Sequence, residues 1–307
     1  MARLGIIGAG HVGEIVAYTA ALRGGYKEIV LYDIDEKRLD GVVSDLEDAD
    51  RFYPHDTTVV AGDIEEVAKS DQIVVCSGRI PENAQRRDEY KNNYQDVTDY
   101  IPRVMAAGFK GIFVVVTNPC DAIAYAVWKS SGTDASRVIG SGTALDSERS
   151  RTIIAREFGL SADSVDSMML GEHGDSQFLP YSQVRLHHVP FDRYIEEIER
   201  DVDKAKLEET VVYKGHRAFF GKGSTQYGIA NTVNDILDAV HYDTKRTLQV
   251  STLHRGEYGL KDVYLSTPCV IGKDGIERVI ELDLTDEERK KYAESAEIVR
   301  SYIISDR

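Results

Sequence analysis

The sequence predicts an α/β protein, with a doubly wound parallel sheet in its N-terminal half and an α+β domain in its C-terminal half. In the first half, short β-branched runs alternate with amphipathic helical stretches, the pattern of parallel strands covered by helices on both faces. After about Gly142 this alternation stops. At 307 residues the chain is also long for one hydrophobic core. We therefore expect two domains, residues 1–142 and 143–307.

The elements of the first half follow from local patterns. Short apolar, β-branched runs predict strands at 4–7, 28–32, 57–61, 72–77, 112–117 and 137–139. Helical periodicity predicts helices at 11–23, 36–47, 88–108 and 121–131.

The second half mixes both kinds of element. We expect helices at 145–158, 192–213 and 224–240, and strands around 165–170, 184–188, 247–253, 263–271 and 278–282. Thr285-Asp286-Glu287-Glu288 is a capping box that opens the last helix. The boundary between the two halves is where we expect a ligand cleft.

The composition argues against several partners. A formal charge of −15, from 37 basic and 52 acidic side chains, repels nucleic acid and anionic lipid. No apolar stretch approaches the ~20 residues that span a bilayer, and no signal peptide is evident. Cys76, Cys120 and Cys269 form no C-x-x-C pair, which favours a reducing compartment without disulfides or a bound metal. We expect a cytoplasmic protein that binds neither nucleic acid nor membranes.

A glycine-rich loop, Gly8-Ala9-Gly10-His11-Val12-Gly13, follows the first strand and opens a helix. In this pattern Gly8 permits a tight turn, Gly10 lets the backbone approach a pyrophosphate, and Gly13 lets the helix pack on the strand. The helix N-terminus, with His11 and Val12, offers N–H groups to the phosphates. The context on both sides predicts a Rossmann dinucleotide-binding site.

Asp33 ends the next strand, 20 residues past Gly13. Its carboxylate can accept hydrogen bonds from the adenosine ribose and would repel a 2′-phosphate, which favours NAD over NADP. The alternative interpretation is a glycine-rich turn with Asp33 as a helix cap. It is disfavoured because every feature of the motif is present.

Four polar residues stand out near the domain boundary. His173 lies between glycines in Gly171-Glu172-His173-Gly174-Asp175-Ser176, which leaves it accessible. Asp146 and Arg149 open the helix after Gly142, where alone they are typical of a helix N-terminal acid and a surface base. Asn118 ends a buried strand, at the edge where parallel sheets place ligands, although a residue before proline can also simply form a turn.

These segments together resemble the lactate/malate dehydrogenase family along essentially the whole chain. Gly-Ala-Gly-His-Val-Gly, Thr-Asn-Pro, Gly-Thr-Ala-Leu-Asp-Ser-Glu-Arg and Gly-Glu-His-Gly-Asp-Ser occur in the family's order and near its spacing. Within the family the sequence looks closest to bacterial L-lactate and L-2-hydroxyisocaproate dehydrogenases, as Gly-Lys-Gly-Ser-Thr-Gln-Tyr-Gly at 221–228 also indicates. The resemblance implies an NAD-dependent enzyme that reversibly transfers hydride between NADH and a 2-oxo acid, with the catalytic groups in the C-terminal domain.

The resemblance also implies a role for each polar residue. His173 would relay the proton, because an imidazole titrates near working pH, and Asp146 would hold its other ring nitrogen. Arg149 would clamp the substrate carboxylate with a two-pronged bond. Asn118 would bond the reacting oxygen or His173 beside the nicotinamide. Thr225 is a further expected substrate contact, and the expected NAD contacts are Gly8, Gly10, His11, Val12, Gly13, Asp33, Ser77, Gly78, Asn93, Thr117 and Asn118.

In the family, a mobile loop also carries an arginine that polarises the substrate carbonyl as the loop closes and excludes water. Residues 78–87 match this loop and contain two adjacent candidates. The spacing to Asn93, Pro102 and Asn118 favours Arg86, with a loop one residue shorter than usual. Arg87 is the alternative.

In the family, a residue of the same loop distinguishes lactate from malate dehydrogenases. Lactate enzymes typically carry Gln at this position, and malate enzymes carry Arg. Ile80, Pro81 and Glu82 form an apolar or acidic lining that argues against a dicarboxylate, whereas an inward-pointing Arg79 would allow a malate dehydrogenase. Gly228 leaves room for a substrate larger than pyruvate. We expect a monocarboxylic 2-oxo acid and leave its side chain open.

The resemblance further implies self-association into dimers or tetramers. Many bacterial members are activated by fructose 1,6-bisphosphate through an arginine and a histidine. Arg151 matches the arginine, but Asp166 occupies the histidine's position, where a carboxylate would repel phosphate. We therefore do not expect this regulation.

Two other classes of protein fit the sequence less well. A non-catalytic NAD-binding sensor would have gaps in the catalytic set, which is complete here. An NAD- and metal-dependent glycosidase is suggested only by Cys120 beside Asn118, and the chain is short for that class and lacks a convincing Cys/His metal set.

Overall fold

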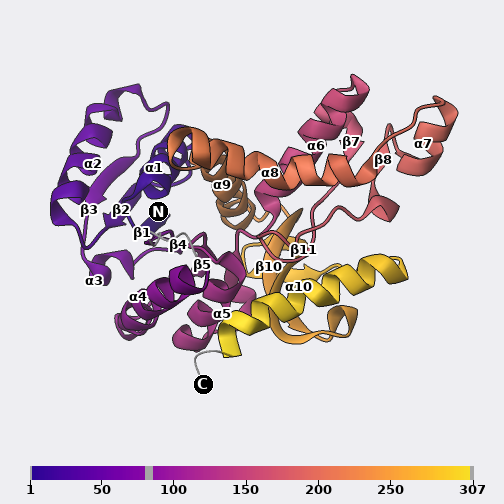
Figure 1. Cartoon of the computed structure of the whole chain (residues 1–307). Coiled ribbons are helices and arrows are strands. Elements are labelled where there is room, and N and C mark those ends of the chain that lie inside the picture. The colour runs from indigo at the N-terminus through magenta and orange to yellow at the C-terminus, as the bar shows by residue number, and fades with distance from the viewer. Residues whose placement is uncertain (1, 80–85, 305–307) are drawn as a thin grey trace.

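A nine-stranded sheet forms the centre of the molecule. The computed structural model describes residues 2–79 and 86–304, and its strand order is β12-β11-β10-β6-β5-β4-β1-β2-β3. The strands from β3 to β6 pair in parallel, with helices on both faces (Figure 1). The predicted fold class is confirmed. These strands are β1 (Arg3–Ile7), β2 (Glu28–Tyr32), β3 (Thr58–Ala61), β4 (Gln72–Val75), β5 (Ile112–Val115) and β6 (Val138–Gly140).

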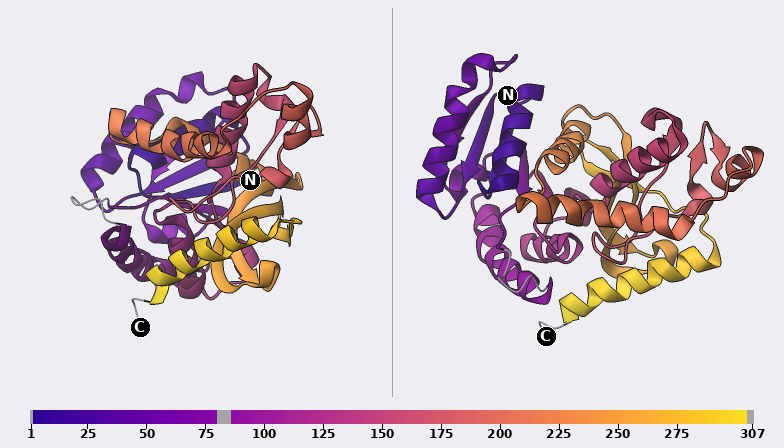
Figure 2. Two further views of the ribbon diagram at one scale, coloured as in Figure 1. Left: turned by 45° about the vertical axis from the view of Figure 1, so that its right-hand side comes forward. Right: turned by 45° about the horizontal axis from the view of Figure 1, so that its top comes forward.

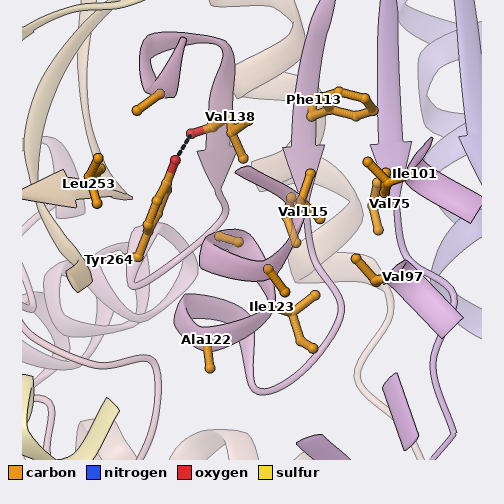
Figure 3. Packing of buried hydrophobic residues seen from close by; sticks show 14 of the residues in the cluster. Val75, Val97, Ile101, Phe113, Val115, Ala122, Ile123, Val138, Leu253 and Tyr264 are labelled. Carbon is orange, nitrogen blue, oxygen red and sulfur yellow. Dashed lines mark hydrogen bonds between the residues drawn. The ribbon is translucent and has the colours of Figure 1, made fainter. Parts of the chain in front are cut away.

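The two faces of the parallel sheet bury separate hydrophobic clusters, because successive strand side chains point to opposite sides. Phe113 and Val115 of β5 pack with residues of α4 and α5, as Figure 3 shows, whereas Val114 belongs to the other cluster. The first cluster includes residues of α3 (Ile64–Val67), α4 (Arg86–Ala106), α5 (Cys120–Ser131) and α10 (Asp286–Ile304). The second includes residues of α1 (His11–Arg23), α2 (Glu36–Asp48) and α9 (Tyr227–His241).

The C-terminal strands continue the same sheet. β10 (Arg246–Arg255), β11 (Lys261–Gly272) and β12 (Gly275–Val279) form an antiparallel extension that meets β6 through Ser251 and Gly140. The sequence patterns did not indicate this junction, since it depends on one long-range pairing. A separate three-stranded sheet contains β7 (Val165–Asp166), β8 (Arg185–Leu186) and β9 (Val189–Pro190).

One predicted helix, 192–213, is wrong. The structure has two helices there, α7 (Phe191–Glu197) and α8 (Lys204–Lys222). Glu199 between them has a φ of +50°, and the Asp203 side chain accepts a hydrogen bond from the Lys206 N–H, so it caps a new helix. α8 then continues nine residues past the predicted end and crosses the molecule toward α1 (Figure 2).

The predicted capping box of the last helix is confirmed. The Thr285 N–H donates to Glu288 Oε2 over 2.9 Å, and the Glu288 N–H donates to Thr285 Oγ1 over 3.2 Å. α10 then runs from this cap toward α5 (Figure 1). Within residues 2–79 and 86–304, no helix is both long and apolar enough to cross a bilayer.

Candidate active site

β1 passes into α1 through the glycine loop, and each glycine there meets a different steric demand. Gly8 has a φ of +106°, and a Cβ on it would lie 2.4 Å from the Ser77 nitrogen. A Cβ on Gly13 would lie 1.9 Å from the Gly8 carbonyl oxygen, so only glycine lets α1 approach the strand this closely. A Cβ on Gly10 would meet nothing within 4 Å. The N-terminus of α1 therefore faces open space that fits a pyrophosphate.

Asp33 follows β2 and is tied to this loop. Its Oδ2 accepts the Ala9 N–H over 2.7 Å, and its Oδ1 accepts the Asp35 N–H over 3.0 Å. Each carboxylate oxygen keeps a second lone pair for a ribose hydroxyl. His11 and Val12 lie in the first turn of α1, with the exposed His11 ring 3.7 Å from Glu14.

The carboxyl ends of β4 and β5 lie side by side next to the glycine loop, because Val75 and Val115 pair in parallel. Both strands end two residues earlier than predicted. Thr117 Oγ1 donates to the Ser77 carbonyl over 2.5 Å, and the Ser77 hydroxyl lies 2.9 Å from that of Tyr100. The Thr117 side chain thus joins the two strand ends, and the Ser77 side chain joins them to α4.

Asn93 joins the start of the predicted substrate loop to the turn at Asn118. The Asn93 amide accepts the Arg79 N–H, next to Gly78, over 2.9 Å and donates to the Asn118 carbonyl over 2.7 Å. Asn118 Oδ1 is buried with no hydrogen-bond partner in the described part of the protein. Because buried acceptors are normally satisfied, this atom fits a ligand that carries a donor.

His173, Asp146 and Arg149 come together around one buried carboxylate. His173 Nδ1 lies 2.7 Å from Asp146 Oδ2, and Arg149 Nη1 donates to Asp146 Oδ1 over 2.6 Å. Asp146 is 1% exposed, whereas His173 is 25% exposed. Asp146 and Arg149 lie one turn apart on α6 (Ala144–Phe158), and His173 lies in the loop between β7 and β8.

The electrostatics keep this carboxylate charged. Burial raises the pKa of Asp146, but the charges and hydrogen bonds of His173 and Arg149 outweigh it and hold that pKa below its ordinary value. The ionised carboxylate therefore accepts a hydrogen bond from Nδ1–H of the imidazole and fixes the ring against α6.

α8 lies against the guanidinium of Arg149. A Cβ on Gly215 would lie 3.0 Å from Arg149 Nη1, so the absence of a side chain lets the helix lie against the guanidinium. A Cβ on Gly228, at the start of α9, would lie 3.0 Å from Leu145 Cδ1, so Leu145 bounds the space that this glycine provides. Thr225 lies in the short connection between α8 and α9.

The sequence reasoning missed Gly215 and also Asp121, whose carboxylate accepts the His173 N–H over 2.7 Å. Asp121 follows Asn118 by three residues at the carboxyl edge of the sheet. This position was the one available signal that it borders a site.

Of the arginines in the predicted substrate loop, only the side chain of Arg79 is described. Residues 80–85, with Ile80, Pro81 and Glu82, lie outside the described residues, as do the side chains of Arg86 and Arg87 at the start of α4. Arg79 is described, and its Nε donates to Asp96 Oδ2 of α4 over 3.1 Å. Its guanidinium pairs with this carboxylate.

No group of three or more His, Cys, Asp or Glu side chains among residues 2–79 and 86–304 is arranged to hold a metal ion. Cys76, Cys120 and Cys269 are free thiols.

The comparisons with known proteins agree with this geometry. Residues 2–140 match the NAD binding domain of lactate/malate dehydrogenase, and residues 143–305 match its alpha/beta C-terminal domain. An L-lactate dehydrogenase of Fusobacterium nucleatum is 36% identical over 98% of this chain and 96% of its own length. L-lactate dehydrogenase 1 of Bifidobacterium longum is 38% identical over 97% of this chain and 95% of its own.

A solved structure gives the same result. The crystal structure of minor L-lactate dehydrogenase from Enterococcus mundtii in the ligands-bound form matches with a TM-score of 0.96 and 31% identity, over 100% of this chain and 98% of that one. The resemblance inferred from the motifs is therefore confirmed, and the chain belongs to the lactate/malate dehydrogenase family of NAD-dependent oxidoreductases.

Proposed function

We propose that this protein is an L-lactate dehydrogenase-type enzyme that reversibly reduces a monocarboxylic 2-oxo acid to the L-2-hydroxy acid. The observation that carries the proposal is the Asp146 carboxylate, which contacts both the imidazole of His173 and the guanidinium of Arg149. The substrate class needs those two groups side by side, one for the oxygen on C2 and one for the acid.

NAD would lie along the carboxyl edge of the parallel sheet. The glycine loop and α1 would hold the pyrophosphate, Asp33 the adenosine ribose, and the segments at Ser77, Gly78, Asn93, Thr117 and Asn118 the nicotinamide half. When bound, the cofactor supplies or accepts the hydride at C2 of the substrate.

The chain's own residues would supply the rest of the chemistry. Arg149 would bind the substrate carboxylate with the N–H groups that Asp146 leaves free. In the reductive direction, protonated His173 would give its Nε2 proton to the carbonyl oxygen, and Asp146 would stabilise the imidazolium before transfer. In the oxidative direction, neutral His173 would take the hydroxyl proton. We retain Arg86, with Arg87 as the alternative, as the loop arginine that polarises the carbonyl.

A monocarboxylic substrate is supported by two observations. Arg79, the residue that a malate-type assignment would turn inward, pairs with Asp96, and the relatives named above are L-lactate dehydrogenases. A malate dehydrogenase is accordingly not favoured. A 2-oxo acid with a larger side chain, as in the isocaproate enzymes, requires that Leu145 beside Gly228 leave enough space for that side chain. Thr225 remains a proposed substrate contact.

We also propose a cytoplasmic dimer or tetramer with domains at 1–142 and 143–307, because the free thiols fit a reducing compartment and the family resemblance implies self-association. Activation by fructose 1,6-bisphosphate is not proposed. The Arg151 side chain pairs with Glu148, and the exposed acid Asp166 would repel phosphate.

The test is an NADH-oxidation panel with pyruvate, 2-oxoisocaproate, phenylpyruvate and oxaloacetate, each with and without fructose 1,6-bisphosphate. We expect a monocarboxylic acid to give the highest kcat/KM and the bisphosphate to leave the rates unchanged. A clear preference for oxaloacetate would contradict the proposed substrate class.

A further inference from the structure

A second buried carboxylate, besides Asp146, contacts His173. Asp121 lies in the first turn of α5 and is 2% exposed. Its Oδ2 accepts the His173 main-chain N–H over 2.7 Å, and its Oδ1 accepts the Ser251 hydroxyl of β10 over 2.5 Å. The carboxylate therefore joins α5, β10 and the His173 loop.

Two buried carboxylates therefore contact His173, one at its ring and one at its main chain. Asp146 contacts the ring at Nδ1, and Asp121 contacts the main chain. Both are almost fully buried, so their charges are weakly screened by solvent. An anion within one residue's length of an imidazole favours the protonated ring.

Three further titratable groups lie around Asp121. Glu172 faces it from the His173 loop, Cys120 precedes it on α5, and Tyr292 faces it from α10. Burial raises the pKa of Asp121 to about 6, although the hydrogen bonds from Ser251 and His173 act in the opposite direction. Asp121 is therefore charged at neutral pH, where it interacts with His173, and is protonated in mild acid.

We propose that Asp121 is a positioning residue for His173, which fixes the main chain of the histidine and favours its protonated form through the buried charge. This inference rests on the proposed role of His173 as the proton relay. In that role the charge of Asp121 sets the pH at which the enzyme changes from a proton donor to a proton acceptor.

Asp121→Asn separates the charge from the hydrogen bonds. The amide oxygen can still accept the His173 N–H, and the amide nitrogen can donate to the Ser251 hydroxyl, so the geometry is kept. We expect the pKa of His173, followed by NMR in the full-length protein with ¹³C-labelled histidine, to fall by about one unit. The His173 resonance is identified by its absence in His173→Gln.

The same variant changes the pH profile in a defined direction. Reduction of the 2-oxo acid needs protonated His173, so reductive activity falls as the pH rises through the pKa of His173. In Asp121→Asn we expect this fall at a lower pH. Oxidation of the hydroxy acid needs neutral His173, so it begins at lower pH. Ser251→Ala keeps the carboxylate but removes its hydroxyl donor, and we expect a smaller shift in the same direction.

Glu288→Gln is the matched control. Glu288 is also a buried carboxylate with several hydrogen bonds, to Ser182 and Thr285, but it caps α10. We expect this variant to lose stability without moving the His173 resonance. An unchanged pKa of His173 in Asp121→Asn would overturn the inference. If the wild-type protein reduces no 2-oxo acid, the proposed function fails, while the NMR titration still decides whether Asp121 acts on His173.

Discussion

At the scale of single residues, the active site depends on how one buried carboxylate is shared. Asp146 is bound by His173 and Arg149 at once, so each of the three side chains constrains the other two. The arginine must also present two parallel N–H groups to a substrate carboxylate, a geometry that an ammonium group cannot reproduce.

Arg149→Lys tests this point. The lysine keeps the positive charge but loses the two-pronged bond, so we expect kcat/KM for the 2-oxo acid to fall about a hundredfold, mainly through KM. Steady-state kinetics against Arg156→Lys, an exposed position on the same helix, provides the comparison. A wild-type KM in Arg149→Lys would refute the carboxylate clamp.

Motifs in the sequence were sufficient to find His173, Asp146, Arg149 and Asn118, because short segments carry each of them. Asp121 and Gly215 were missed for a physical reason. The hydrogen bond from His173 to Asp121 spans 52 positions, and that from Ser251 spans 130. Gly215 matters only because α8 packs against Arg149. Local patterns contain no information about such contacts.

At the scale of elements, the positions at which helices begin and end determine which of them contact the active-site residues. Apart from α3, which was not predicted, the strands and helices of the parallel sheet were predicted to within a few residues, since hydrophobic periodicity dominates there. The pattern across 192–213 was misread as one helix because the break depends on the Asp203 cap, a local signal that a continuous charged pattern conceals. The resulting α8 is the helix that lies against Arg149.

A side chain at position 215 should displace the guanidinium of Arg149, because a Cβ there would lie 3.0 Å from its Nη1. We expect Gly215→Val to raise KM for the 2-oxo acid by about tenfold or more, because small displacements of a positioning group are costly, and to leave NADH affinity unchanged. Gly221→Val on the same helix is the control, since a Cβ there meets nothing within 4 Å. Equal effects of the two substitutions would show that helix propensity, rather than contact with Arg149, is responsible.

At the scale of the whole molecule, the two predicted halves are closely joined. The sheet continues from β6 into β10, and α1 of the nucleotide-binding half packs on α9 of the other half within one hydrophobic cluster. Arg23 of α1 adds polar contacts across this junction, with hydrogen bonds to Asp235 over 2.6 Å, Asp238 over 3.1 Å and Asn231 over 2.9 Å. The sequence indicated both halves but could not place them, because pairing between distant elements leaves no periodic signal.

Arg23→Ala should therefore weaken the fold. We expect a loss of about 1–2 kcal/mol in the free energy of unfolding, because Asp235 and Asp238 both lose the Arg23 guanidinium, although Asp235 keeps its contact with Arg246. Urea unfolding measures this loss, with Arg193→Ala as the control for an exposed ion pair within one helix. A loss no larger than that of the control would mean that Arg23 adds little to the junction.

The central claim is that His173 transfers the proton while the N-terminal half holds the cofactor. The most direct measurement compares wild-type protein with His173→Gln for NADH binding by fluorescence and for turnover of pyruvate. The account predicts unchanged NADH affinity with turnover reduced by about three orders of magnitude or more. Turnover close to the wild-type rate in His173→Gln would contradict it.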